Sequence, residues 1–260
     1  ALATVSSGTT SIGFIGIGVT SISADAAGTF LAYLEGVQGK AMEAGTVTVY
    51  SIYDASADAK AIQPSKGISA TLVGLDTNLA KAQVRTNARA KIQGAGMVTS
   101  AGSVSVTVTG TALSKAEVLS GSVSVSGAKI GVNVVESTLG ATQEAAIEGV
   151  SLAAPDVTVK SLFNDGKTEG ATAKVGGTTG TDISLVSAKV NSATAISGAT
   201  SKAYISGAGL DVAGALTVGS EGTSIALATV SSGTTSIGFI GIGITVITAD
   251  AQGTFEAFLE

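Results

Sequence analysis

The first 35 residues of the chain return at its end. Ala1–Glu35 reappears as Ala226–Glu260, identical at 29 of 35 positions and offset by 225 residues. Recurrence of a long stretch at a fixed offset is typical of proteins built from stacked copies of one unit. The sequence therefore predicts one period of 225 residues and the start of the next, as an excerpt from a longer tandem array.

Shorter modules fill this period. Four of them open alike, as Gly45-Thr-Val-Thr-Val49, Gly102-Ser-Val-Ser-Val106, Pro155-Asp-Val-Thr-Val159 and Gly214-Ala-Leu-Thr-Val218. Their starts are spaced by 57, 53 and 59 residues, and a further 56 complete the 225. We expect one continuous repeat domain over 1–260, with modules of about 55 residues at approximately 1–36 (partial), 37–93, 94–148, 149–206 and 207–260. Extra residues near Asn164–Thr168 predict a longer turn.

Period-two alternation predicts strands. Between Ala80 and Ile92, small apolar residues alternate with polar ones, so that all the cations of this stretch fall on one face. A helix would scatter these cations around its axis. Hairpin signals such as Asn-Gly flanked by alternating strands are missing, which favours stacked parallel strands. The predicted fold class is all-β, a parallel β-solenoid (β-helix), with one wide coil of three or four strands per module; two coils per module is the alternative.

Composition excludes several classes of site. The chain has 35 Gly, 2 Pro and no Cys, His or Trp, so thiolate ligands, imidazole ligands and histidine proton shuttles are absent. Its net charge of −5, with scattered Lys and Arg, argues against a nucleic-acid partner. Ala1–Ala24 carries no charge but is interrupted by Ser, Thr and Gly, which argues against a membrane-spanning helix. We predict no catalytic residue, cofactor or metal site.

One column of the repeat is polar and nearly invariant. Each of its members lies 14 residues before a closing Ile or Leu: Asn78, Asn133, Asn191, Thr20 and Thr245. Stacked amides can hydrogen-bond along a solenoid and satisfy buried backbone groups. The prediction is an internal structural ladder at one turn of the coil; a row of ligand-binding side chains is the alternative.

Three other patterns invite functional interpretations. Hydroxyl residues between the module valines, such as Thr48, Ser105, Thr158 and Thr217, could form a flat array for ice or polysaccharide, but we predict an ordinary solvated strand face. Asp54 and Asp58 share a strand face about 13 Å apart, too far for a catalytic carboxylate pair. The stretch 13–18 resembles a nucleotide loop without a following helix. The aromatic residues Phe14, Phe30, Tyr33, Tyr50 and Tyr53 are predicted to pack in the core or at caps.

The sequence pattern of the modules resembles that of a known family. Modules that run Gly-x-Val-x-Val, then an alternating Gly/Ser/Ala-rich stretch, then Ala-Tyr-Ile/Leu-x-Gly, as in Ala203-Tyr-Ile-Ser-Gly207, are similar to those of bacterial leukotoxin-type filamentous adhesins. These are giant cell-surface proteins related in style to the filamentous haemagglutinins. The resemblance implies an extracellular, non-catalytic β-solenoid acting as a rigid stalk, with no catalytic residue to transfer.

This resemblance also sets the expected partners. They are neighbouring repeats of the same chain, other copies in filaments or bundles, and a host or neighbouring-cell surface. Two other functions stay open at this point. One is a self-assembling extracellular fibre or sheath of laterally packed solenoids, and the other is a carbohydrate-binding or carbohydrate-active solenoid.

Overall fold

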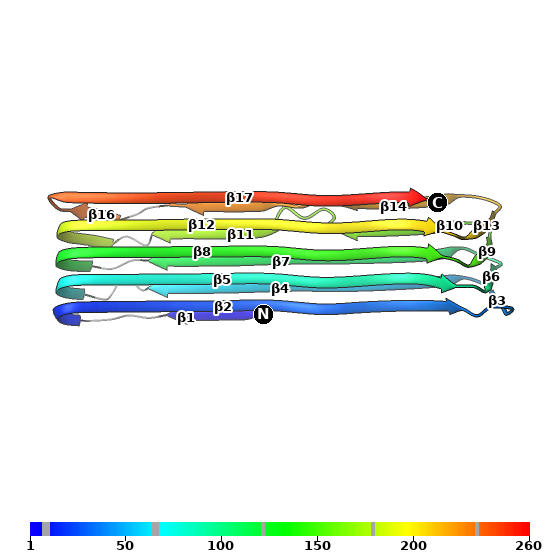
Figure 1. Cartoon of the computed structure of the whole chain (residues 1–260), viewed down its shortest axis with the longest axis horizontal. Coiled ribbons are helices and arrows are strands. Elements are labelled where there is room, and N and C mark those ends of the chain that lie inside the picture. Colours follow the sequence, from blue (N-terminus) through cyan, green and yellow to red (C-terminus); the bar gives the residue numbers. More distant parts are fainter. Residues whose placement is uncertain (7–10, 64–67, 121–122, 178–179, 232–233) are drawn as a thin grey trace.

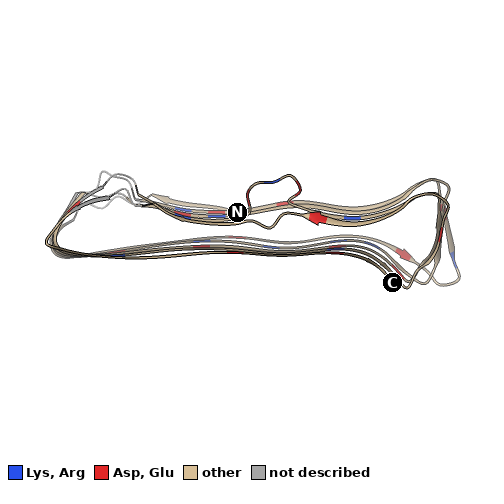
Figure 2. Cartoon of the chain, turned by 90° about the horizontal axis from the view of Figure 1, so that it is seen from above, with Lys and Arg blue, Asp and Glu red and all other residues tan. Residues whose placement is uncertain are grey.

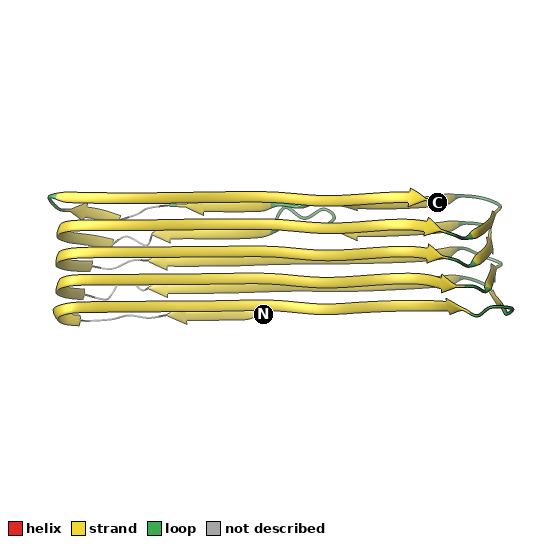
Figure 3. Cartoon of the chain, viewed as in Figure 1, coloured by secondary structure: helices red, strands yellow, loops and turns green. Residues whose placement is uncertain are grey.

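The structure is a computed structural model, and it describes residues 1–6, 11–63, 68–120, 123–177, 180–231 and 234–260. All regular elements of these residues are β-strands (Figure 3). Each strand runs parallel to its neighbours, and the strands wind into five stacked levels, here coils one to five from the N-terminus (Figure 1). The prediction of an all-β parallel β-solenoid is confirmed.

The longest strands form one side of the solenoid, which we call the long wall. Its strands are β2 (Ser11–Gly36), β5 (Ile68–Gly94), β8 (Val123–Glu148), β12 (Gly180–Ser206), β16 (Thr234–Ile237) and β17 (Ile240–Leu259). They follow the order β2, β5, β8 and β12, and both β16 and β17 pair with β12 in the last coil. Each coil thus adds one strand level to this wall.

A second sheet faces the long wall, and we call it the facing wall. Its strands are β1 (Leu2–Ser6), β4 (Val47–Gln63), β7 (Val104–Ser120), β10 (Val157–Phe163), β11 (Ala171–Gly177), β14 (Leu216–Gly222) and β15 (Ala226–Val230). β10 and β11 both pair with β7, on either side of the segment 164–170. The longer turn predicted near Asn164–Thr168 is confirmed.

The third sheet closes one narrow end of the coil (Figure 2). It contains β3 (Ala41–Ala44), β6 (Met97–Ser100), β9 (Ser151–Ala154) and β13 (Gly209–Val212). Glycines shape the corner before it: Gly94, Gly149 and Gly207, which end the long-wall modules, all have positive φ, between 57° and 117°. Only glycine adopts such angles without steric cost. Each full module therefore contributes one coil with one strand level in each sheet, which confirms the prediction of one wide coil per module.

The 225-residue period corresponds to four coils. Ile240 pairs with Val186, Val186 with Ala128, Ala128 with Val73, and Val73 with Ile15. The two copies of the repeated segment thus occupy the same column, four levels apart. The module boundaries expected from the sequence fall at the ends of the long-wall strands.

The walls lie close together because their inward side chains are complementary in size. In the facing wall, one inward column reads Tyr53, Gly110, Phe163 and Gly222. The opposite column of the long wall reads Phe30, Ala88, Gln143, Ser201 and Phe255. A Cβ atom placed on Gly110 would overlap the Tyr53 ring and the Gln143 amide. Large residues of one wall therefore occupy space that small residues of the other leave free, as close packing requires.

Candidate functional site

The predicted amide ladder lies inside the solenoid. Asn78 Nδ2 donates to Asn133 Oδ1, and Asn133 Nδ2 donates to Asn191 Oδ1, both at 2.9 Å. Thr20 and Thr245 continue the column at its two ends. One part of the prediction is wrong: these residues lie within the long strands β2, β5, β8, β12 and β17 and not at a turn, since the strands continue unbroken through this point.

The ladder is structural in its geometry. All three Asn side chains are buried, so a ligand would have to open the coil to reach them. The central amide, Asn133, uses both its donor and its acceptor along the axis, and buried polar groups of this kind stabilise a fold when they are paired. The ladder therefore fixes the register between coils.

Serine hydroxyls join the two walls across the core. Ser137 Oγ donates to the Ser114 carbonyl at 2.7 Å, and Ser161 Oγ lies 2.7 Å from Ser201 Oγ. The Gln143 amide and the Tyr53 hydroxyl are hydrogen bonded at 2.9 Å. Because these bonds cross between sheets, they hold the flattened coil at a fixed thickness.

Outward charges of the long wall pair between coils. The pairs include Lys81–Glu136 at 3.4 Å, Arg89–Glu144 at 3.2 Å, Lys202–Glu256 at 2.8 Å, and Arg85–Asp25. Each pair joins neighbouring levels of the wall. Exposed pairs contribute little individually, but like charges stacked on one column would repel, so the alternation of sign favours this stacking order.

The densest polar cluster on the described surface surrounds Lys91. Its Nζ donates to Glu144 at 2.9 Å and to Glu148 at 3.1 Å, and the Tyr204 hydroxyl donates to both carboxylates. The Tyr204 ring stacks on Phe258 with centroids 4.8 Å apart. Two carboxylates, an ammonium and a phenol thus meet in one place, drawn from coils two to four.

The charge states of this cluster suit a clamp between coils. Burial works to lower the pKa of Lys91, but hydrogen bonds and charge from both glutamates outweigh it and raise that pKa. Burial and the same carboxylates raise the pKa of Tyr204 well above its usual range. Burial opposes ionisation of Glu144, yet bonds from Lys91 and Tyr204 lower its pKa. Lys91, Tyr204 and Glu144 therefore keep fixed protonation states near neutral pH, whereas general acid–base catalysis needs a group that exchanges its proton there.

The other sequence patterns have simple structural explanations. Thr48, Ser105, Thr158 and Thr217 do form one column on the outside of the facing wall. Asp54 accepts a hydrogen bond from Thr111 at 2.7 Å. Residues 13–18, which resembled a nucleotide loop, lie within strand β2.

The prediction for the aromatic residues is partly wrong. Phe30 and Tyr53 stack in the core with centroids 5.3 Å apart, as expected. Phe14, Tyr33 and Tyr50 are instead exposed, with 82% of the Phe14 surface accessible. Their positions face outward in the alternation, and sequence reasoning had no reason to expect aromatic residues there.

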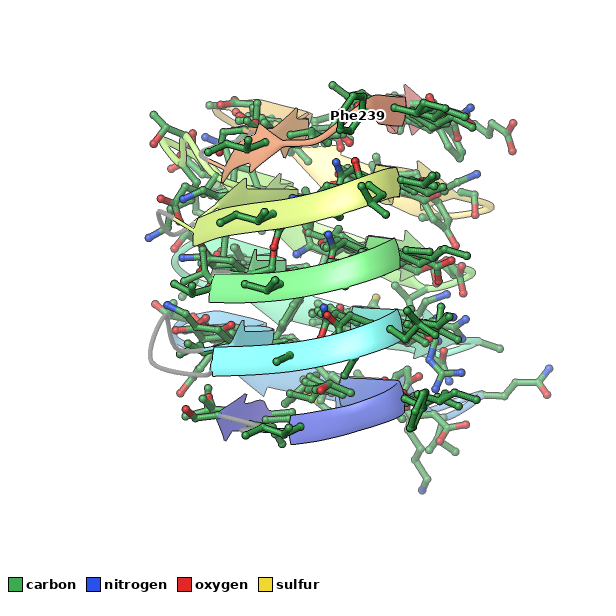
Figure 4. All side chains as sticks on the ribbon, turned by 90° about the vertical axis from the view of Figure 1, so that its left-hand side faces the viewer. Phe239 is labelled. Carbon is green, nitrogen blue, oxygen red and sulfur yellow. The ribbon has the colours of Figure 1, made fainter. Side chains whose placement is uncertain are left out.

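One narrow end of the coil is apolar outside and polar inside. We call this surface the apolar edge. It is formed by the outward side chains of five ranges that are ladder partners in consecutive coils: 12–19, 70–77, 125–132, 183–190 and 237–244. Figure 4 looks directly at this end, with Phe239 on the last coil. Phe239 is 90% exposed. Sequence reasoning missed this surface, although the isoleucines at positions 12, 15 and 17 recur at 237, 240 and 242.

The interior beneath the apolar edge holds charges. Lys129 Nζ donates to Asp182 at 2.7 Å and to Ser124 Oγ at 2.8 Å, and lies 3.8 Å from Asp76. Burial, with Asp182 nearby, raises the pKa of Asp76 against the pull of Lys129. Burial also lowers the pKa of Lys189. Charged and hydroxyl groups therefore occupy the place that Ala and Val occupy elsewhere in the core.

Among the residues that the structure describes, no group of three or more acidic, Cys or His side chains is placed to hold a metal ion. The same residues contain no helix long and apolar enough to cross a membrane. In comparisons with known proteins, no family model, no curated protein and no solved structure matches the chain.

Proposed function

We propose that the chain is a non-catalytic structural segment of a giant extracellular bacterial surface filament or adhesin, in which it acts as a rigid, repeat-built stalk. One observation carries the proposal: the 225-residue period equals four complete coils in a single ladder register. A unit of this kind extends along its axis by stacking further copies, with no change of geometry at the junction.

The internal bonding supports a stiff rod. The amide ladder joins coils two, three and four along the axis. Serine bonds join the walls across the core. Bending such a rod would break axial and transverse hydrogen bonds together, so we expect stiffness in both directions.

The length of tandem chains tests the proposal. At about 4.8 Å per strand level, each 225-residue period adds about 19 Å of height. A long-wall strand of 26 residues makes the coil about 86 Å wide. Chains with eight, sixteen and thirty-two periods should therefore appear by electron microscopy as straight rods about 150, 310 and 610 Å long, in proportion to the number of periods. Rods of constant length, or flexible strings, would reject the stalk. Immunogold labelling of intact cells of the source with an antibody to the segment should mark surface filaments; labelling confined to the cell interior would reject the location.

A second candidate is a self-assembling extracellular fibre or sheath in which laterally packed solenoids form the material. The apolar edge favours it, because exposed contiguous apolar surface promotes association. Counting solenoids in cross-sections of native filaments separates the candidates. A stalk shows one solenoid or a single pair in each section, and a sheath shows many side by side.

A further inference from the structure

The apolar edge is not a consequence of the open ends of the solenoid. Coils two to four have neighbours above and below, yet four of their outward apolar side chains at this edge remain more than 40% exposed: Val73, Ile130, Leu185 and Val186. The two phenylalanines of this edge, Phe14 and Phe239, are 82% and 90% exposed and lie four coils apart in the first and last copies of the repeat. Large apolar side chains thus line this edge from end to end.

Charge is excluded from the outside of this edge. The five ranges that form it contain three charged residues, Asp76, Lys129 and Lys189. Lys129 pairs with Asp76 in the interior, and Lys189 lies in the same inward ladder column as Asp76. The exposed surface is therefore uncharged, whereas the outside of the long wall beyond it carries Lys81, Arg85 and Arg89. Protein interfaces show the same depletion of charge at their centres.

The repeat of the edge indicates what covers it. Its apolar rows follow one another at the spacing of the β-ladder, about 4.8 Å. An occupant that matches every row needs the same spacing over the same length, and a second copy of this chain has it. A lipid surface would not need rows in register, and membrane-binding faces usually combine apolar groups with Trp and with Lys or Arg. The chain has no Trp, and no cation faces outward among the described residues of this edge.

The area of the apolar edge sets the expected affinity between two chains. Five coils give a height of about 24 Å, and the run from position 12 to position 19 gives a width of about 20 Å, so each copy offers about 500 Å². A standard stable interface takes about 800 Å² from each partner. Two chains of five coils should therefore associate weakly, and the affinity should rise steeply as coils are added.

We propose that the apolar edge is a lateral interface between two copies of this chain, which pack side by side with their narrow ends together. This inference rests on the proposed structural role and adds the surface and the partner through which rods associate. It differs from stacking at the strand edges of the first and last coils, because lateral contact thickens the particle and stacking lengthens it.

The test compares two matched variants of the full chain by sedimentation and small-angle scattering. The edge variant replaces Phe14, Ile17, Phe239 and Ile242 with Ser. The control variant replaces Leu31, Tyr50, Ile52 and Leu227 with Ser, all exposed apolar residues away from the edge; Ile17 and Ile52, for example, are 69% and 67% exposed. Circular dichroism checks that both variants keep the β-fold.

We expect the natural chain to associate reversibly with a larger cross-sectional radius of gyration. The edge variant should weaken this association by about ten-fold or more, and the control variant by less than about two-fold. Equal association of the two variants, a monomer at all concentrations, or growth in length alone would overturn the proposal. Flotation of a monomeric chain with phosphatidylcholine vesicles would also overturn it and would make the edge a membrane surface. None of these results depends on rod length or cellular location, so failure here is distinct from failure of the stalk.

Discussion

Each long-wall strand has two parts with opposite polarity. From position 80 onward, for example in β5, inward positions hold Ala80, Ala82 and Val84, and outward positions hold charged or amide side chains, beginning with Lys81. Before position 78, inward positions hold Asp76 and the Lys129 cluster, while outward positions hold Val73 and its apolar ladder partners. The alternation is interrupted at Leu72 and Val73, which are both exposed. From Val73 onward, the same positions face inward and outward through both parts.

The two parts of the strand share the same backbone geometry and differ only in residue type. Positions 76, 78 and 80 all face inward, so no change in the direction of the side chains divides the two parts. The backbone accepts Lys81 on the same outward side as Val73 and Leu75, and an ordinary polar surface would therefore fit the apolar edge. Since one solenoid alone does not need this apolar exterior, the difference between the parts is a reason for the lateral contact that we propose.

The largest effect on stability is expected in the part with an apolar core. Gly110→Ala places a methyl group into the Tyr53 ring and the Gln143 amide. We expect a loss of about 3 kcal/mol in the free energy of unfolding, measured with guanidinium chloride. The control is Gly140→Ala, where the nearest atom to the new Cβ, the Val84 carbonyl oxygen, lies at 3.9 Å. Its change should stay within about 0.5 kcal/mol. Equal losses in both variants would refute the size complementarity of the walls.

The next largest loss of stability is expected at the amide ladder, which lies at the boundary between the two parts. Asn133→Leu removes both axial hydrogen bonds and leaves the amides of Asn78 and Asn191 buried with one partner fewer. We expect a loss of about 2–3 kcal/mol. Replacing all three Asn residues with Leu should recover part of this loss, because no amide is then left unpaired. A triple variant less stable than the sum of three single variants would contradict a purely structural ladder.

The polar interior beneath the apolar edge gives a third effect. Lys129→Met leaves Asp76 and Asp182 without their shared ammonium group and should cost about 1–3 kcal/mol. Lys81→Met is the matched control, since Lys81 is exposed and its pair with Glu136 spans 3.4 Å. We expect less than about 0.5 kcal/mol there. Similar costs for both substitutions would mean that the Lys129 cluster is solvated and not part of the core.

The sequence predicts the repeated parts of this architecture well. Parallel strands, one coil per module and the column of Asn78, Asn133 and Asn191 all follow from alternation and spacing, because a stacked fold forces equal positions into one column. The position of that column within a strand was not predicted, since the Gly-containing stretch before it reads equally well as strand and turn, although the stretch after it reads as a strand.

Other features depend on which residues face each other across the coil. The pairing of Gly110 with Gln143 joins two different strands, and no spacing within either strand reveals it. The apolar edge was not predicted, for a related reason. Alternation shows that Val73 and Asp76 lie on opposite sides of a strand. Hydropathy then assigns the side with Val73 to the core. That assignment fails where the chain keeps apolar side chains outside.

The smallest effect concerns pH, and it should have opposite signs in the two parts. Glu144 lies in the charged outward face, where burial raises its pKa less than Lys91, Tyr204 and Arg89 lower it. Its stabilisation is therefore present above the ordinary carboxyl pKa and is lost as the pH falls through the lower folded value. Asp76 lies beneath the apolar edge, where burial raises its pKa. Its contribution is favourable at low pH and is lost as the pH rises through the higher folded value.

Urea unfolding at steps between pH 7 and pH 3 measures both contributions. Glu144→Gln should lessen the loss of stability on acidification, because the variant has no carboxylate to protonate there. Asp76→Asn should raise the stability near neutral pH and steepen the loss toward pH 3, since it removes a carboxyl group whose protonation favours the folded state. Each change should be below about 1 kcal/mol, because both side chains keep some contact with water. If both variants change the slope in the same direction, the two parts of the strand do not differ in the way that their contacts indicate.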